Sequence, residues 1–247
     1  MCRMMGVISK GPVYYDLFEE FADLSVGGMC PDGGPDARGH REGWGLVCFQ
    51  NGRLSVDMRG AGGAKDDPRF YQAAWKVARI NVERREGSLL VVIAHVRRAS
   101  PGGLLGAEFT HPLVAKAGER DVAFAHNGTL VGFDMGMEGR LDTAVYLEAL
   151  LAARDGGTER AFRDAILAMR TRYRPTSLTS LLTDGTALHA LRSFAGRPEY
   201  YTLFYDHWEE MVVFCSEPIL SMHREPVGNG ELISVDSDLG ITRAEVA

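Results

Sequence analysis

The second residue of the chain is a cysteine, in Met1-Cys2-Arg3-Met4-Met5-Gly6. An initiator methionine before a small residue is commonly removed, which leaves Cys2 with a free α-amino group. A thiol of pKa about 8.5 is only slightly ionised at neutral pH, whereas an α-amine of pKa about 7.7–8.0 is available to accept its proton. One residue then supplies both a nucleophile and its base. We therefore interpret Cys2 as a candidate nucleophile; the alternative is a structural cysteine that happens to be second.

Two charged residues could bind the head group of an amino acid. Arg97 follows an apolar run in His95-Val96-Arg97-Arg98-Ala99-Ser100, and a guanidinium at a strand end can donate two parallel hydrogen bonds to a carboxylate. Asp142 opens a predicted helix, where an acidic residue is also an ordinary first-turn or N-cap residue. As a ligand, its carboxylate could pair with an ammonium group. Together, Arg97 and Asp142 could recognise a zwitterion; separately, each is explained by a surface or capping role.

A third candidate is His126-Asn127-Gly128, at the end of a short predicted strand. The side-chain amide of Asn127 and the backbone N–H of Gly128 could supply two donors to a tetrahedral oxyanion, and losing one such donor typically costs about 3–4 kcal/mol of barrier. We expect Gly128 to let the backbone approach the substrate closely and to take a positive φ. The alternative is a common Asn-Gly turn, which is how we interpret Asn51-Gly52.

Other reactive residues point to structure rather than chemistry. His95, His111 and His126 lack the His-x-His or His-Glu-x-x-His spacing of a metal site, so no metal is expected. Cys48 and Cys215 lie in apolar runs and are predicted to be core residues. The Gly-rich segment 27–43 has no Gly-Lys-Ser/Thr ending for a phosphate site; it is instead a candidate lid.

Composition limits the class of protein. The 247 residues include 27 Lys and Arg against 33 Asp and Glu, for a net charge of −6, and 45% are hydrophobic. These values are typical of a globular protein, and without a basic run they disfavour nucleic acid as a partner. No apolar stretch of about 18 residues and no signal-peptide pattern is present, so we expect no membrane association and a cytoplasmic location. Four widely spaced cysteines without Cys-x-x-Cys disfavour a zinc ribbon or a disulfide framework.

The elements that must position these residues alternate between strands and helices. A hairpin is predicted around Asn51-Gly52, and the apolar run 88–97 is typical of a strand that is buried on both faces. Strands are predicted at 4–9, 44–50, 54–58, 88–97, 121–126, 177–183, 186–193, 199–205, 211–215 and 231–235. Helices are predicted at 16–24, 68–84, 141–154 and 159–173. This order indicates a mixed, layered architecture.

The order of the motifs resembles that of the class II glutamine amidotransferases. The motifs are Cys2, Gly43-Trp44-Gly45, Arg97 with Ala99-Ser100, His126-Asn127-Gly128 and Asp142-Thr143. The chain start, Thr110-His111-Pro112 and Cys215-Ser216-Glu217-Pro218 are most similar to short, stand-alone members, including those that hydrolyse γ-glutamyl amides in ergothioneine synthesis. The resemblance implies an N-terminal nucleophile (Ntn) hydrolase with an α+β fold, a four-layer αββα sandwich, in a single domain over residues 2–247.

The resemblance also implies a role for each candidate. Cys2 would be the nucleophile with its own amine as base, and Asn127 and Gly128 would form the oxyanion hole. The substrate α-carboxylate would be bound by Arg97 with the Ser100 hydroxyl beside it, and the α-ammonium by Asp142. Two positions depart from the family pattern. Arg98 stands where the family often has Trp, and Leu141-Asp142-Thr143-Ala144 replaces Ser-Asp-Thr-Glu, so the pocket rim and the restriction to glutamine are expected to differ.

These roles imply cleavage of glutamine or a γ-glutamyl amide through a γ-glutamyl thioester, without a metal or an organic cofactor. Because few residues remain for a synthase domain, the ammonia acceptor would lie on a separate synthetase chain, or the protein would be a plain amidohydrolase. One alternative is a catalytically silent, amino-acid-binding regulatory subunit that keeps Met1. Another is a metal-dependent hydrolase that uses the histidines.

Overall fold

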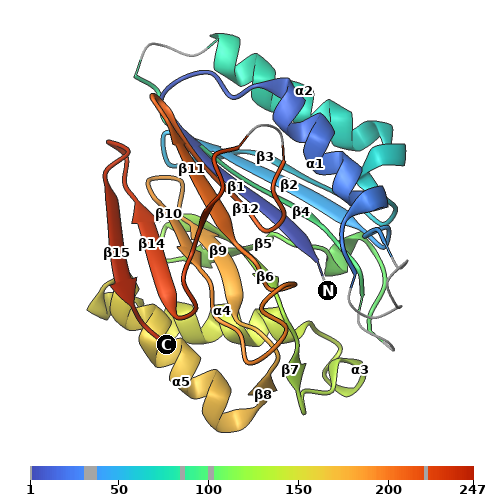
Figure 1. Cartoon of the computed structure of the whole chain (residues 1–247), viewed down its shortest axis with the longest axis vertical. Coiled ribbons are helices and arrows are strands. Elements are labelled where there is room, and N and C mark those ends of the chain that lie inside the picture. Colours follow the sequence, from blue (N-terminus) through green and yellow to red (C-terminus); the bar gives the residue numbers. More distant parts are fainter. Residues whose placement is uncertain (1, 31–37, 84–86, 100–102, 220–221) are drawn as a thin grey trace.

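The computed structural model describes residues 2–30, 38–83, 87–99, 103–219 and 222–247. These residues form two large antiparallel sheets with helices outside them (Figure 1). The first sheet has seven strands in the order β13-β11-β12-β1-β4-β2-β3. Its strands are β1 (Arg3–Ser9), β2 (Trp44–Gln50), β3 (Arg53–Gly60), β4 (Leu90–Val96), β11 (Phe204–Trp208), β12 (Met211–Cys215) and β13 (Glu225–Pro226).

The second sheet has six strands in the order β15-β14-β10-β9-β6-β5. Its strands are β5 (Leu113–Ala117), β6 (Arg120–Asn127), β9 (Thr179–Thr183), β10 (Leu188–Leu191), β14 (Glu231–Val235) and β15 (Ile241–Glu245). A separate short pair joins β7 (Leu130–Val131) to β8 (Arg174–Pro175). The helices are α1 (Tyr15–Gly27), α2 (Pro68–Glu83), α3 (Met135–Glu138), α4 (Asp142–Ala152) and α5 (Thr158–Arg172).

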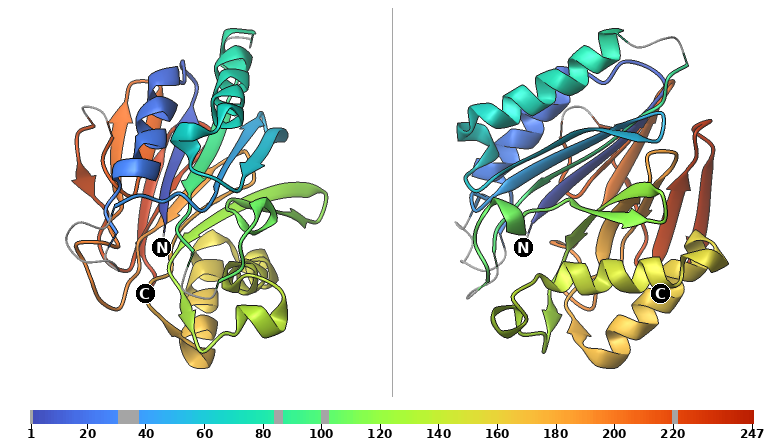
Figure 2. Two further views of the ribbon diagram at one scale, coloured as in Figure 1. Left: turned by 90° about the vertical axis from the view of Figure 1, so that its right-hand side faces the viewer. Right: turned by 180° about the vertical axis from the view of Figure 1, so that it is seen from behind.

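Helices α1 and α2 cover the outer face of the first sheet, and α4 and α5 cover the second (Figure 2). The alternation of side chains along the strands explains how each sheet buries both faces. In β1, Met5 and Val7 pack under α1 and α2, whereas Met4 and Ile8 pack between the two sheets. Both faces of the strand are therefore apolar, as the continuous hydrophobic runs predict.

Most predicted elements are confirmed, including the hairpin at Asn51-Gly52, where both residues have positive φ (49° and 77°). The prediction of a strand at 199–205 is wrong over most of its length, because β11 begins only at Phe204 and Tyr200 bonds back to the carbonyl of Arg197 in a turn. The strands β5 and β15 were not predicted. Among the described helices, none combines the length and the apolar character that a membrane crossing requires.

The strand ends bring the sequence candidates to one place. Cys2 directly precedes β1 and Arg97 directly follows β4, and these two strands are antiparallel neighbours with Arg3 opposite Val96. By alternation, Cys2 lies on the face of Met4, and Arg97 on the face of Ile93, which is the face between the sheets. Asn127 ends β6 of the other sheet, on the same face as Ala125. The candidate site is thus at one end of the space between the sheets.

Candidate active site

Cys2 and Asn127 are in direct contact across the two sheets. The backbone nitrogen of Cys2 donates to Oδ1 of Asn127 over 3.2 Å, and both residues are buried. The Cys2 thiol faces the backbone carbonyl of Arg98, with 3.8 Å between the sulfur and the oxygen. The structure therefore brings the candidate nucleophile next to the candidate oxyanion residue.

The contact with Cys2 also sets the orientation of the Asn127 side chain. Because Oδ1 accepts from a backbone N–H, the amide nitrogen Nδ2 must point the other way. Nδ2 is buried and has no hydrogen-bond partner among the described residues. Buried donors are almost always paired, so an open one beside a thiol marks a place for a ligand acceptor.

Arg97 presents a second open donor. Its side chain is buried, and Nη2 donates to the carbonyl of Leu104 over 2.7 Å. Nη1 is buried without a partner in the described part of the chain. The backbone of Arg97 is held on both sides, since its N–H bonds to Gly43 and its carbonyl accepts from Glu42. The guanidinium is thus anchored at one end and open at the other, as a carboxylate ligand requires.

Asp142 supports the segment that follows Asn127. Its Oδ2 accepts from the backbone N–H of Leu130 and its Oδ1 from that of Thr143, each over 2.8 Å. The residue begins α4, as predicted, with Leu141 at the N-cap. Asp142 therefore has a structural role that the sequence suggested, and it stays a predicted ligand for an ammonium group.

The backbone at Gly128 closely approaches another part of the protein, and its predicted approach to the substrate stays a prediction. A Cβ at this position would lie 2.0 Å from the carbonyl oxygen of Ser177 and 2.6 Å from Nε2 of His126. The expected positive φ is not found; the need for glycine comes from crowding by the Ser177 carbonyl. The peptide after Asn127 is therefore held tightly.

Two predicted features lie wholly or partly outside the described residues. Ser100 is one of them, and so is the middle of the candidate lid at 27–43, of which 31–37 are not described. The described flanks of that segment are joined by a bridge between Met29 and Arg38. Both assignments stay predictions.

A partly buried ion pair lies behind Cys2 and is not among the features predicted from the sequence. Arg3 is 1% exposed, and its Nε lies 2.7 Å from Oε2 of Glu217. Its guanidinium lies 4.4 Å from the centroid of the Tyr200 ring, and the Tyr200 hydroxyl faces the Cys2 carbonyl at 3.5 Å. Next to it, Ser216 exchanges two hydrogen bonds with the backbone of Met4. The motif Cys215-Ser216-Glu217-Pro218 thus holds the strand that carries the nucleophile.

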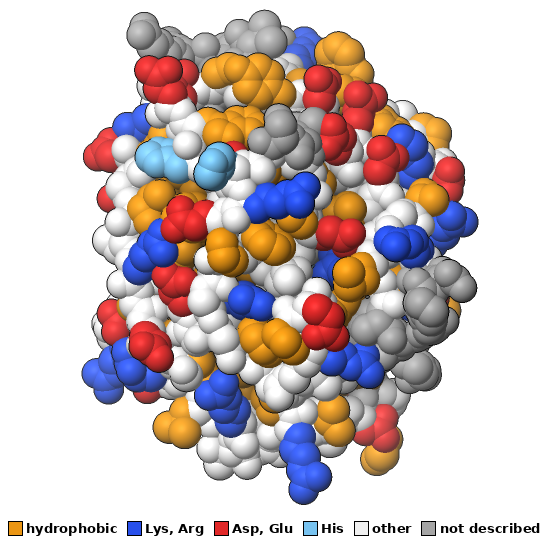
Figure 3. Space-filling model, in the orientation of Figure 1, with side chains coloured by type: hydrophobic (Ala, Val, Ile, Leu, Met, Phe, Trp, Pro, Cys, Tyr) orange, Lys and Arg blue, Asp and Glu red, His pale blue; other side chains and the backbone are white. Residues whose placement is uncertain are grey.

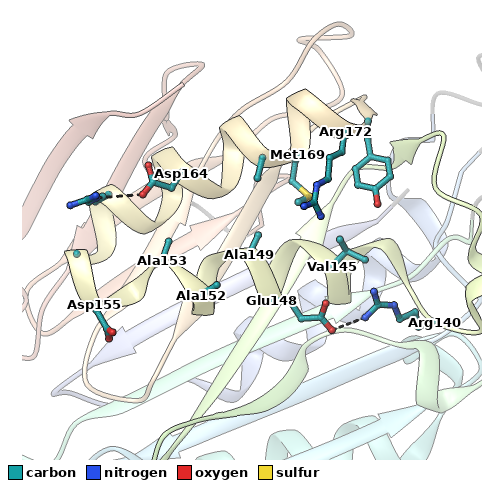
Figure 4. A pocket seen from close by; sticks show the side chains of 14 residues that line it. Arg140, Val145, Glu148, Ala149, Ala152, Ala153, Asp155, Asp164, Met169 and Arg172 are labelled. Carbon is teal, nitrogen blue, oxygen red and sulfur yellow. Dashed lines mark hydrogen bonds and ion pairs between the residues drawn. The ribbon is translucent and has the colours of Figure 1, made fainter.

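A hollow with a volume of about 850 Å³ lies between α4 and α5 (Figure 4). Ala149, Ala152 and Ala153 line it, and the ion pairs Arg140–Glu148 and Arg160–Asp164 neutralise charges at its edge. Cys2, Arg97 and Asn127 do not line it.

On the face shown in Figure 3, positive and negative side chains are intermingled. Among the described residues, no group of three or more His, Cys, Asp or Glu could hold a metal ion.

Comparison with known proteins shows the family of the chain. Residues 1–246 match the family described as glutamine amidotransferases class-II, and the chain belongs to that family. An uncharacterized protein of Methanocaldococcus jannaschii is 26% identical in a match of 220 residues, and the match covers 82% of this chain and 54% of that protein.

Solved structures show the same fold. Glutamine phosphoribosylpyrophosphate amidotransferase from B. subtilis, complexed with ADP and GMP, superposes with a TM-score of 0.67 at 15% identity, over 99% of this chain and 49% of that chain. A glutamine aminotransferase class-II domain protein from Silicibacter pomeroyi has a TM-score of 0.59 at 15% identity, over 99% of both chains. The chain therefore spans about half the length of the first two relatives and the full length of the third.

Proposed function

We propose that the protein hydrolyses glutamine or another γ-glutamyl amide through a γ-glutamyl thioester on Cys2, in a single αββα domain over residues 2–247 from which Met1 has been removed. One observation carries the proposal. Cys2 lies against Asn127, whose Nδ2 is a buried donor that has no partner among the described residues. A nucleophile beside an open donor is the minimum arrangement for acyl transfer.

In the proposed reaction, Sγ of Cys2 attacks the amide carbon of the substrate side chain, and the thiol proton passes to the α-amine of the same residue. The carbonyl oxygen becomes an oxyanion that accepts from Nδ2 of Asn127 and the N–H of Gly128. The amine then gives its proton to the leaving nitrogen, and ammonia or an amine departs. Water then adds to the thioester carbon and gives a proton to the free α-amine. The C–S bond breaks, the amine returns that proton to the Cys2 thiolate, and the γ-carboxylic acid that forms ionises to a carboxylate.

The substrate head group would bind between Arg97 and Asp142. The open Nη1 of Arg97 supports a role in binding the α-carboxylate, and Ser100 is proposed to stand beside it. Asp142 already accepts two backbone hydrogen bonds, but an ionised carboxylate has about four acceptor positions, which leaves room for an ammonium group. Arg97, Ser100 and Asp142 would thus bind the amino-acid end of the substrate. The amine end would contact the rim of the pocket, to which Arg98 is assigned.

The fate of the ammonia belongs to the proposal as well. The B. subtilis relative is a phosphoribosylpyrophosphate amidotransferase of about twice this length. We propose that the ammonia either passes to a separate ammonia-using synthetase chain or is released, in which case the protein acts as an amidohydrolase.

The test is a screen of glutamine and γ-glutamyl amides for ammonia or amine release, with protein shown by intact mass to begin at Cys2. Turnover that is lost in Cys2→Ala would support the proposal. Glutamine binding without turnover, by a chain that keeps Met1, would instead identify the silent regulatory subunit. Turnover by Cys2→Ala would refute the thioester mechanism.

A further inference from the structure

The peptide bond between Arg98 and Ala99 is contacted on both sides. Its carbonyl oxygen, which belongs to Arg98, faces Sγ of Cys2 at 3.8 Å. Its N–H, which belongs to Ala99, donates to Oε2 of Glu42 over 2.6 Å. One peptide therefore lies between the candidate nucleophile and a carboxylate that the proposed reaction does not use. Glu42 is not among the site residues predicted from the sequence.

Backbone hydrogen bonds place Glu42 beside this peptide. The N–H of Glu42 donates to the carbonyl of Arg97 over 2.9 Å, and the N–H of Arg97 donates to the carbonyl of Gly43 over 2.7 Å. Gly43 has a φ of 140°, and a Cβ there would lie 2.4 Å from Cγ2 of Thr110, so this path of the chain requires glycine. The motif Gly43-Trp44-Gly45 thus fixes the residue that precedes it against the end of β4.

The side chain of Glu42 binds a group that lies beyond the sheet. The strand β4 ends at Val96, so the N–H of Ala99 is outside the ladder, and the carboxylate accepts from it. Such a bond is charge-assisted, which agrees with its short length. Because the Glu42 side chain is exposed, water can bind the Ala99 N–H when the carboxylate is removed. The fold should therefore tolerate substitutions of Glu42.

The planarity of the peptide carries this contact to the thiol. The Arg98–Ala99 bond is trans, and in a planar trans peptide the N–H and the C=O point in opposite directions. An N–H that is directed at Glu42 therefore directs the carbonyl at Cys2. The carboxylate also polarises the peptide, which makes the carbonyl oxygen a better acceptor.

The carbonyl in turn favours one orientation of the Cys2 side chain. Sγ is placed by rotation about a single bond with three staggered positions, so even the weak acceptor interaction of a thiol favours one of them. The backbone N–H of Cys2 is already bound to Oδ1 of Asn127. Together, the contact of the backbone and the contact of the thiol determine where Sγ lies relative to Nδ2 of Asn127, the open donor.

We propose that Glu42 is a positioning residue for the nucleophile, which acts through the Arg98–Ala99 peptide on the thiol of Cys2. This inference rests on the proposed function, since the position of Sγ affects the rate only if Sγ attacks the substrate. A displacement of a reacting atom by about 1 Å can cost about 100-fold in rate, and a weak contact supplies part of that. The proposed contacts of the substrate head group do not involve the Glu42 side chain, so KM should change little.

Three substitutions of Glu42 separate the reach of its side chain from its charge. Glu42→Gln keeps an acceptor oxygen at the same reach without the charge, Glu42→Asp keeps the charge on a shorter side chain, and Glu42→Ala keeps neither. With the γ-glutamyl amide that the wild type cleaves best, we expect kcat to fall about tenfold in the Asp and Ala variants and to stay within about threefold in the Gln variant. KM should stay within about twofold in all three. The maximal rate at which a glutamine-like diazoketone alkylates Cys2 should follow the same order, because alkylation requires the same attack by Sγ.

The control is Glu231→Ala, at a carboxylate that accepts from the backbone N–H of Gly228, also over 2.6 Å. It should leave kcat and KM unchanged. Melting temperatures show which variants fold, and if Glu42→Ala does not, Glu42→Asp against Glu42→Gln gives the same comparison. A folded Asp or Ala variant with wild-type kcat, a Gln variant as slow as these two, or a rise in KM alone would overturn the inference. A wild-type protein that cleaves no γ-glutamyl amide and is not labelled at Cys2 would overturn the proposed function instead.

Discussion

The backbone nitrogen of Cys2 donates to Oδ1 of Asn127 over 3.2 Å, although the two residues are 125 positions apart in the chain. The contact joins the start of β1 in one sheet to the end of β6 in the other. It also leaves Nδ2 of Asn127 as an open donor. The spacing of the two sheets thus determines the distance between the nucleophile and the donor proposed to stabilise its intermediate.

Asn127→Asp should separate the role of Oδ1 from that of Nδ2 in the Asn127 side chain. The variant keeps an oxygen that can accept from Cys2, but it replaces the Nδ2 donor by a second acceptor oxygen. We expect kcat for glutamine to fall by about two to three orders of magnitude, because a donor to the oxyanion is lost. The measurement is steady-state kinetics on a variant whose melting temperature equals that of the wild type. A change of less than about fivefold would place the oxyanion hole elsewhere.

Arg97→Lys should mainly raise KM. Lysine offers a point charge in place of a fork, so it cannot bond to the Leu104 carbonyl and to a carboxylate in the same geometry. The matched control is Arg192→Lys, at a residue whose guanidinium donates to the carbonyls of Tyr201, Val227 and Pro198. The control should lower the melting temperature and leave KM for glutamine unchanged. An unaltered KM in Arg97→Lys would remove Arg97 from the site.

A glutamine-like diazoketone should label Cys2 and spare the core cysteines. Burial raises the pKa of the Cys48 and Cys215 thiols to about 12, so they are protonated at neutral pH. Peptide mapping by mass spectrometry after labelling is the measurement, with Cys2→Ala as the control. Labelling at Cys48 or Cys215 in the folded protein, or equal labelling of Cys2→Ala, would contradict the assignment of the nucleophile.

Gly128→Ala should destabilise the protein and lower kcat together. The added Cβ would meet the Ser177 carbonyl at 2.0 Å, so the peptide that follows Asn127 must shift, at a cost of about 1–3 kcal/mol in the free energy of unfolding. Gly62→Ala is the control, since nothing lies within 4 Å of a Cβ there. Chemical denaturation and kinetics of both variants would test this. Equal stability of the two variants would speak against crowding at Gly128.

The buried histidines predict a loss of stability in mild acid. Burial lowers the pKa of His189 to about 4, whereas the unfolded chain has a value near 6.5. As the pH falls from about 6.5 towards 4, the unfolded chain binds a proton that the folded chain does not, so the free energy of unfolding decreases. His95 and His111 act in the same direction. Melting temperatures from pH 7 to 4.5 should fall less steeply for His189→Gln than for the wild type; parallel curves would refute the role of His189.

The elements that the sequence predicted are those with a strong local pattern. The hairpin at Asn51-Gly52, the buried strand β4 and the helices α4 and α5 all have periodic apolar residues or an explicit turn signal. The edge strands β5 and β15 escaped prediction because their burial is partial and their pattern is weak. A strand was wrongly predicted at 199–205 because tyrosines favour strands. In the structure these tyrosines are buried by contacts with distant residues such as Arg3.

For the site, the residue types were predictable but their contacts were not. The motifs indicated Cys2, Arg97 and Asn127 because each type has a defined chemistry. The contacts of Arg3 with Glu217 and of His95 with His111 depend on which segments become neighbours in the fold. Local sequence patterns do not determine which strands pair or in which register. Gly128 is an example: the sequence predicted that its backbone approaches the substrate, but it did not indicate the close contact with the Ser177 carbonyl.

The strand that begins at Arg3 lies in the interior of its sheet, between β4 and β12, and β12 ends at Cys215. During synthesis the ribosome must therefore add more than two hundred residues before this strand gains its second neighbour. At about 5–20 residues per second, that interval lasts roughly 10 to 40 s. Until β12 pairs with it, one edge of this strand has no neighbour in the sheet, so the first residues are less enclosed than in the complete fold. Removal of Met1, which the proposed function requires, would thus be easiest during translation, before the C-terminal part of the chain completes the sheet.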